Sequence, residues 1–236
     1  MEKDNQKIDW EKFWEYQQIE RRGEYQVHHS KLNFISKIIR RHLSIGGKVL
    51  DVGFSDGYLL QVLAKNNYNL FGIDISVKNI AITAKELGAK GISVKLVQSE
   101  SKKMPFVDDF FDLVFLGDIL EHLDNNDLAL TLQEVYRVLR SGGRIIITTP
   151  YRQNIKESLV LCPKCSHLFE PNGHMQSFDE KNLAGFLCQV GFKDIKQKKI
   201  YALNLANNFL SRFIIGWGMK LVGFGQGITL LIIARK

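Results

Sequence analysis

The stretch that decides the fold is residues 49–60, which read VLDVGFSDGYLL. A short apolar run ends in small residues and then continues into a helical pattern. Small residues let a ligand approach the backbone, and the first turn of a helix offers N–H groups without intrahelical partners. A dinucleotide fingerprint would place glycines as G-x-G-x-x-G, but Ser55 and Tyr58 fill its second and third positions. We therefore expect a strand, a ligand-binding turn or a plain tight turn, and a helix, but not a dehydrogenase.

Strands and helices alternate on both sides of this stretch. Short β-branched runs that alternate with helices of ten or more residues predict crossover units, and hence an α/β fold with a doubly wound parallel sheet covered on both faces. Helical patterns are also expected over 8–43 and 205–222. The expected strands cover residues 48–53, 68–74, 92–97, 111–116, 144–149, 192–202 and 228–235, and the helices between them cover 57–65, 77–87, 127–139 and 179–190.

A second motif ends the next expected strand. Residues 70–76 read LFGIDIS and place Asp74 at the strand tip, 17 positions after Gly57. A carboxylate at such a tip can accept hydrogen bonds from both hydroxyls of a ribose, although an acidic residue there can also be a helix N-cap.

These motifs and two later ones resemble those of class I S-adenosylmethionine-dependent methyltransferases. The pattern D-x-G-x-S-x-G from Asp51 to Gly57 is similar to the family's D/E-x-G-x-G-x-G, from which Ser55 departs. Residues 99–114, SESKKMPFVDDFFDLV, are similar to D-A-x-x-L-P-F…F-D-L-V, and residues 134–144 to a helix followed by R-V-L-x-x-G-G. The resemblance runs in order from about Val49 to Pro150, and it implies a seven-stranded, mostly parallel sheet with an antiparallel final hairpin.

The resemblance also implies the cofactor, S-adenosylmethionine, and the residues around it. Asp51, Gly53, Ser55 and Gly57 would face its methionine part and Asp74 its ribose. Glu100, where an aspartate is usual, and the N–H of Ser101 would hold the adenine. Ile75 and Gly117 are further expected contacts. On this basis we divide the single domain into a helical cap (1–45), a cofactor-binding core (46–150), an insertion (151–178) and a C-terminal part (179–236).

The acceptor side is expected where the fourth strand ends. Asp118, Glu121 and His122 are spaced i, i+3 and i+4, so a helix would place them on one face. His174 lies in a segment that resembles the H-x-x-x-F of quinone-type O-methyltransferases. The four residues are the catalytic candidates. A similar acidic-and-His arrangement in small-RNA 2′-O-methyltransferases and ubiquinone-pathway O-methyltransferases implies a metal. A metal-free His base and a purely structural role remain alternatives.

The insertion carries Cys162 and Cys165 with His167 close by, which is the ligand spacing of a zinc site. Only half a site is explicit, and His167, His174 or Cys188 would complete it, although Cys188 is expected on a core-facing helix surface. The alternative is a reduced thiol pair in a substrate lid. If His174 bound zinc here, it could not also serve the acceptor cluster.

Composition constrains the acceptor only weakly. The formal charge is +7, with the basic residues scattered rather than gathered, and the N-P-P-Y motif of many amino-directed methyltransferases is absent. We expect a small-molecule, glycan or lipid-linked acceptor, with O-methylation favoured. An RNA methyltransferase and a non-catalytic cofactor-binding subunit are the alternatives. The apolar stripe in 205–222 could contact a membrane or pack on the sheet. The polar start of the chain and its short apolar runs predict a soluble, cytoplasmic protein.

Overall fold

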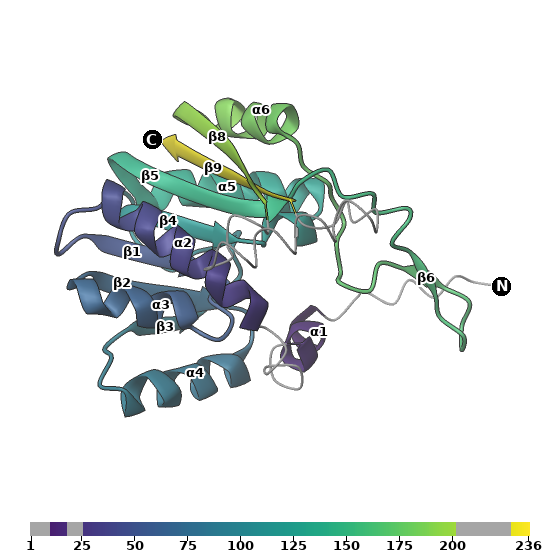
Figure 1. Cartoon of the computed structure of the whole chain (residues 1–236), viewed down its shortest axis with the longest axis horizontal. Coiled ribbons are helices and arrows are strands. Elements are labelled where there is room, and N and C mark those ends of the chain that lie inside the picture. Colours follow the sequence, from purple (N-terminus) through teal and green to yellow (C-terminus); the bar gives the residue numbers. More distant parts are fainter. Residues whose placement is uncertain (1–9, 18–25, 202–227) are drawn as a thin grey trace, which may run out of the picture.

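A computed structural model of the chain describes residues 10–17, 26–201 and 228–236. These residues form a seven-stranded sheet in the order β3-β2-β1-β4-β5-β9-β8 (Figure 1). The first five strands in this order are parallel, and β9 is antiparallel to both of its neighbours. The strands are β1 (Lys48–Val52), β2 (Asn69–Asp74), β3 (Lys95–Gln98), β4 (Phe111–Gly117), β5 (Leu139–Pro150), β8 (Lys193–Tyr201) and β9 (Ile228–Arg235). The predicted seven-stranded, doubly wound α/β fold is confirmed.

The strand order reverses at β1, and this reversal places the site. β1 pairs with β2 on one side and with β4 on the other. The loops that leave the carboxyl ends of β1 and β4 therefore diverge to opposite sides of the sheet. Ligands of open α/β sheets bind at such a switch point.

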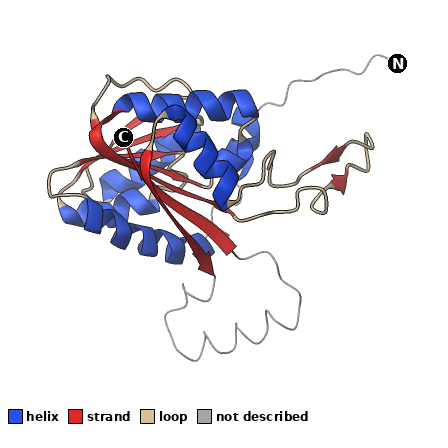
Figure 2. Cartoon of the chain, turned by 90° about the horizontal axis from the view of Figure 1, so that it is seen from above, coloured by secondary structure: helices blue, strands red, loops and turns tan. Residues whose placement is uncertain are grey.

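Helices cover both faces of the sheet (Figure 2). On one face, α2 (Gln26–His42), α3 (Tyr58–Leu63) and α4 (Val77–Ala89) contribute Ile35, Leu60 and Leu87 to one buried cluster. On the other face, α5 (Asn125–Val138) and α6 (Glu180–Val190) contribute Leu132 and Leu187 to a second cluster. The central strands are buried on both faces, which explains why their sequences are continuously apolar. Each fully buried leucine contributes about 1.5–3 kcal/mol.

Side-chain caps fix where three of these helices begin. The side chain of Ser76 accepts the N–H of Asn79 at α4, and that of Asp124 accepts the N–H of Asp127 at α5. Asp179 and Asn182 form a capping box at α6. Each cap contributes about 1 kcal/mol by satisfying N–H groups that have no intrahelical partner. The capped helices hold the loops that lie over the carboxyl ends of the strands.

The structure differs from the sequence-based expectation in several places. The helical pattern over 8–43 contains α1 (Trp10–Glu15) and α2, and β5 begins five residues earlier than expected, directly after α5. The insertion contains a hairpin, β6 (Val160–Leu161) and β7 (Leu168–Phe169), that no sequence signal predicted. The described residues also include the 3₁₀ turns η3 (Ala64–Asn66) and η4 (Leu120–His122).

The expected helix over 205–222 lies outside the described residues, so its membrane role stays a prediction. No helix in the described ranges is long and apolar enough to cross a membrane.

Candidate functional site

The turn between β1 and α3 has a backbone suited to close ligand approach. Gly53, Ser55 and Gly57 have φ angles of 67°, 52° and 71°, in the left-handed region that favours glycine. A Cβ at Gly53 would lie 2.3 Å from Cδ1 of Ile119. Ser55 keeps this conformation, and its carbonyl accepts a hydrogen bond from Nδ2 of Asn79 at 2.8 Å. The serine therefore occupies a backbone position that glycine fits best.

Acidic side chains surround this turn. Asp74, at the tip of β2, is 3% exposed and accepts hydrogen bonds from the N–H of Ser76 at 2.9 Å and Nδ2 of Asn79 at 3.1 Å. Its carboxylate is thus fixed in orientation. Asp51 is also buried, and its pKa is raised well above its usual value by burial first and then by the charges of Asp56 and Asp74. The turn therefore brings the carboxyl groups of Asp51, Asp56 and Asp74 close together.

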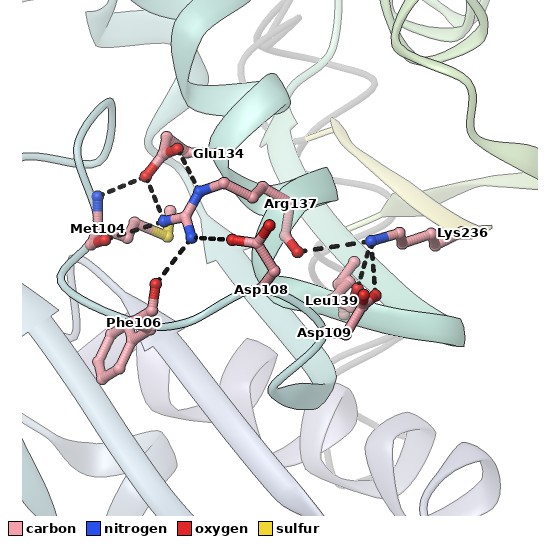
Figure 3. Close-up of polar contacts among 8 residues, drawn as sticks. All are labelled: Met104, Phe106, Asp108, Asp109, Glu134, Arg137, Leu139 and Lys236. Carbon is pink, nitrogen blue, oxygen red and sulfur yellow. Dashed lines mark hydrogen bonds and ion pairs between the residues drawn. The ribbon is translucent and has the colours of Figure 1, made fainter.

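The loop after β3 is clamped to α5. Ser101 shares a hydrogen bond of 2.8 Å with Thr131 of α5, and Glu100 is half-exposed beside Lys102, at 3.4 Å. Further along, Glu134 accepts the N–H of Met104 at 2.7 Å, and the Arg137 guanidinium donates to the carbonyls of Met104 and Phe106 (Figure 3). The loop that follows Glu100 and Ser101 is therefore held in one place by side chains of α5.

Glu121 lies at the centre of a second group of polar side chains. Glu121, His122 and His174 each offer a ligand atom, and these atoms lie within 4.8 Å of one another. Glu121 is 1% exposed; its Oε2 accepts the hydroxyl of Thr149 in β5 at 3.0 Å. Its Oε1 is buried and has no hydrogen-bond partner among the described residues. Burial first, and then the charge of Asp118, raise the pKa of Glu121 to about 8.

The two histidines lie side by side. The ring centroids of His122 and His174 are 4.7 Å apart, and Trp14 of α1 meets His122 edge-on at 4.5 Å. Nδ1 of His122 lies 3.2 Å from the carbonyl of Gly173, so it donates there and leaves the lone pair on Nε2. Burial first, and then His174, lower the pKa of His122 to about 4, and burial also lowers the pKa of His174. Both rings are neutral near pH 7.

Backbone contacts bring the insertion to this cluster. The N–H groups of Met175 and Gln176 donate to the carbonyl of Glu121 at 2.7 and 3.1 Å. Nδ1 of His174 bonds to Oε1 of Gln153. The prediction that His122 and His174 lie close together is confirmed.

Asp118 occupies a different position from the one expected. Residues 120–122 form a single 3₁₀ turn, and Asp118 precedes it with a φ of 53°. The expectation of one shared helix face is therefore wrong. Oδ2 of Asp118 accepts a hydrogen bond from Lys31 of α2, which is 8% exposed. Asp118 is not one of the three residues that share potential ligand atoms, although its charge reaches Glu121.

Comparison with known proteins agrees with this geometry. Residues 50–147 match the methyltransferase domain family. A ubiquinone/menaquinone biosynthesis C-methyltransferase of Desulfotalea psychrophila is 25% identical over 193 residues, which cover 74% of each chain. The ubiquinone biosynthesis O-methyltransferase of Rhizobium etli is 30% identical over 104 residues, covering 44% of this chain and 41% of that one. Residues 50–147 are thus a methyltransferase domain, and the fold around them is that of class I S-adenosylmethionine-dependent methyltransferases.

The methyltransferase fold extends beyond the matched core. The phosphoethanolamine N-methyltransferase 2 of Haemonchus contortus, solved with S-adenosylmethionine, superposes with a TM-score of 0.72 at 17% identity, over 98% of this chain and 60% of that chain. This likeness shows the fold alone. The sequence matches cover less of the relatives than this superposition covers of the present chain. The chain spans 41% and 59% of the lengths of two curated relatives and 74% of a third.

The turn and the acidic tip of β2 fit the family's cofactor. A Cβ at Gly53 would collide with Ile119, so this position of the turn requires glycine, and the carboxylate of Asp74 is already oriented by two donors. At the adenine end, the loop with Ser101 is held against α5. The glycine turn and the oriented carboxylate of Asp74 thus fit an S-adenosylmethionine site.

The predicted zinc ligands are only partly together. Cys162 and Cys165 share the tight turn between β6 and β7. Among the described residues, His167 does not join them in a group of three potential ligands. Cys188 is exposed on α6, so its expected place on the core face is wrong. The buried face of α6 runs instead through Leu183 and Leu187.

Sequence reasoning missed four side chains of the acceptor cluster. Lys31 and Trp14 come from the helices ahead of β1, Thr149 from β5, and Gln153 from the insertion. None belongs to a motif. The only local signal was the aromatic start of the first helical pattern.

Proposed function

We propose that the protein transfers the methyl group of S-adenosylmethionine to a hydroxyl oxygen of a small-molecule acceptor held at Glu121, His122 and His174. The observation that carries this proposal is the position of that buried cluster. It lies between the end of β4 and Thr149 near the end of β5, one strand away from the cofactor turn. Functional groups at the carboxyl ends of parallel strands meet a bound ligand. The same hydroxyl chemistry would serve a glycan or a lipid-linked acceptor.

The relatives support an acceptor of this kind. Two of them are named for ubiquinone or menaquinone biosynthesis, one as a C-methyltransferase and one as an O-methyltransferase. Oxygen is favoured here because the cluster offers groups that can take a proton from a hydroxyl. We therefore choose a phenolic hydroxyl as the first acceptor to test.

On the cofactor side we assign roles by position. Asp51, Gly53, Ser55 and Gly57 would line the methionine part, because they form the turn at the end of β1. Asp74 would accept the ribose hydroxyls, with Ile75 beside it. Glu100 and the N–H of Ser101 would meet the adenine, and Gly117 would lie under the reacting end because it ends β4.

Methyl transfer needs positioning and the removal of one proton. S-adenosylmethionine, when bound, supplies a methyl group on a positively charged sulfur, which departs with the electron pair of the broken bond. The chain aligns an acceptor in line with that bond and takes the hydroxyl proton. The lone pairs of the two neutral imidazoles can accept it. His174 is the better proton acceptor, because the pKa of His122 is lowered to about 4.

A second role for the same cluster is supported by Glu121. A buried carboxyl with one unpartnered oxygen beside two neutral imidazoles is a donor set that fits a divalent cation. Glu121, His122 and His174 would hold it, and such a cation would lower the pKa of an acceptor hydroxyl. Asp118, paired with Lys31, would then shape the site without being a ligand.

The test is methyl transfer from isotope-labelled S-adenosylmethionine to a panel of phenols and catechols, with a transfer RNA mixture in parallel. Label in an O-methyl group is expected. Glu121→Gln and His174→Gln should each lower the rate about 100-fold or more and leave cofactor affinity unchanged. Glu157→Gln and His42→Gln, outside the cluster, are the matched controls. Label in RNA, carbon-bound label, or full activity in the two cluster variants would refute the proposal.

Metal removal separates the two roles of the cluster. A chelator should abolish activity, and Mg²⁺ or Zn²⁺ should restore it, if Glu121 and the histidines hold a cation. If activity is unchanged by the chelator, His174 without a metal ion is the group that takes the proton from the acceptor hydroxyl.

A further inference from the structure

The hairpin of β6 and β7 projects from the body of the molecule (Figures 1 and 2). Five large apolar side chains on it are 39–59% exposed, and Lys164 is the only Lys, Arg, Asp or Glu in 158–169. A hairpin this short is not stable in isolation. Its exposed apolar residues are Leu159, Val160, Leu161, Leu168 and Phe169.

The turn of this hairpin presents two thiols. The N–H of Cys162 donates to the carbonyl of His167 and the N–H of Ser166 to the carbonyl of Cys162, both at 2.8 Å. The two cysteines are three positions apart, as C-x-x-C, on this tight turn. The turn thus holds a pair of adjacent sulfurs in the spacing of a zinc ligand pair.

A structural zinc ion needs four ligands, and the hairpin supplies two. The donors that could have completed the site lie elsewhere in the described part of the chain. His174 contacts His122 and Gln153, and Cys188 lies on α6. His167 forms no three-ligand group with the cysteines. In the described part of the chain the hairpin therefore brings together two zinc ligands, not four.

A second copy of the chain meets these requirements. Two identical pairs related by a twofold axis make a four-sulfur tetrahedral site, and a twofold contact brings the same surface of each copy together. The exposed apolar residues beside the cysteines would be covered in the same contact. Two chains of net charge +7 repel each other, but in residues 158–169 Lys164 is the only charged side chain that would oppose the contact of two hairpins.

We propose that Cys162 and Cys165 form half of a zinc site that the same two residues of a second copy complete, which makes this hairpin a dimerisation element. The four thiols release their protons to solvent as the sulfurs bind the ion. This role is independent of methyl transfer, since the acceptor cluster is made from other residues.

The experiment uses the full chain purified with zinc and without chelator. Elemental analysis should give about 0.5 zinc per chain, and X-ray absorption should show four sulfurs at about 2.3 Å. Light scattering should give twice the chain mass of 27.1 kDa. A strong chelator should return the mass to that of one chain, and added zinc should restore the dimer.

Two variants and a control make the test specific. Cys165→Ser should lose both zinc and dimer, whereas Cys188→Ser, an exposed cysteine on another element, should keep both. Leu161→Asp keeps the sulfurs and should weaken the dimer at least about tenfold, because it places a charge in an apolar contact. One zinc per monomer, a dimer that survives Cys165→Ser, or a Cys162–Cys165 disulfide in the purified protein would overturn the proposal.

Discussion

Replacing Arg137 by Met tests how the loop after β3 is held. The guanidinium binds both oxygens of Glu134, at 2.7 and 2.8 Å, and donates to Asp108 at 2.7 Å. It also donates to the carbonyls of Phe106 at 2.8 Å and Met104 at 3.0 Å (Figure 3). Methionine keeps most of the apolar stem and removes every one of these donors.

The expected loss of unfolding free energy in Arg137→Met depends on how exposed the lost contacts are. The side chain of Arg137 is 31% exposed and that of Asp108 is 72% exposed, so solvent screens the ion pairs to about 0.2–1 kcal/mol. The two carbonyls lose charged donors, each worth about 1.5–3 kcal/mol before screening. We expect a loss of about 2–3 kcal/mol in unfolding free energy, which lowers Tm by about 4–12 °C for a chain of this size.

The pH dependence has a definite sign. The Arg137 guanidinium holds the pKa of Glu134 below its usual value. The stabilisation is therefore complete above the pKa of the unfolded state, about 4.3, and is lost as pH falls through the folded pKa. The difference in stability between wild type and variant should be smaller in acid than at pH 7, because the ion-pair share is lost while the hydrogen bonds to the two carbonyls remain.

Urea and thermal unfolding at pH 7 and at about pH 3 measure both effects. Arg152→Met is the matched control, because that side chain is 61% exposed and contacts Asp179 at 3.3 Å. Its loss should stay below about 1 kcal/mol. A loss under about 0.5 kcal/mol for Arg137→Met, or a loss that is equal at both pH values, would refute this account.

Two further variants probe the cofactor turn. Asp74→Asn should weaken S-adenosylmethionine binding about 10–100-fold in calorimetry, because a charged acceptor worth about 1.5–3 kcal/mol is lost, while the cap variant Asp124→Asn should leave it unchanged. Equal affinity in both would reject the ribose role of Asp74. Gly53→Ala should reduce both binding and stability, since its Cβ would meet Ile119 at 2.3 Å in a left-handed backbone, whereas Gly185→Ala, with nothing within 4 Å, should be neutral or stabilising by about 0.5–1 kcal/mol. Cofactor affinity that survives Gly53→Ala would show that the turn is not the binding site.

The backbone geometry of the proposed cofactor site could be predicted because its signals are local. The strand that ends at Val52, the small residues from Gly53 to Gly57 and the acidic tip at Asp74 are each visible within a few residues of sequence. Parallel pairing of β1 and β2 then brings them together, with Val52 opposite Ile73. Residue choice and backbone conformation agree at Gly53 and Gly57, whose φ angles of 67° and 71° are left-handed.

The acceptor half could be predicted only in part. The positions of Glu121 and His122 in the sequence were informative. The chain, however, forms a 3₁₀ turn there rather than an α-helix, and Asp118 instead pairs with Lys31, 87 residues away in the sequence. No motif marks such a pairing, because it depends on where α2 lies on the sheet. Cys188 was misplaced for a related reason. It follows Leu187 by one residue, which is about 100° around the helix and enough to move a side chain from core to surface.

The crowding of Asp51, Asp56 and Asp74 around one turn bears on turnover. Burial first, and then the charges of Asp56 and Asp74, raise the pKa of Asp51, and a positively charged ligand beside it would favour its ionised form. The methyl donor carries that charge on sulfur, and the spent product does not. If the turn holds S-adenosylmethionine as proposed, we expect it to bind the charged donor more tightly than the neutral product, so that exchange of product for a fresh donor is favoured.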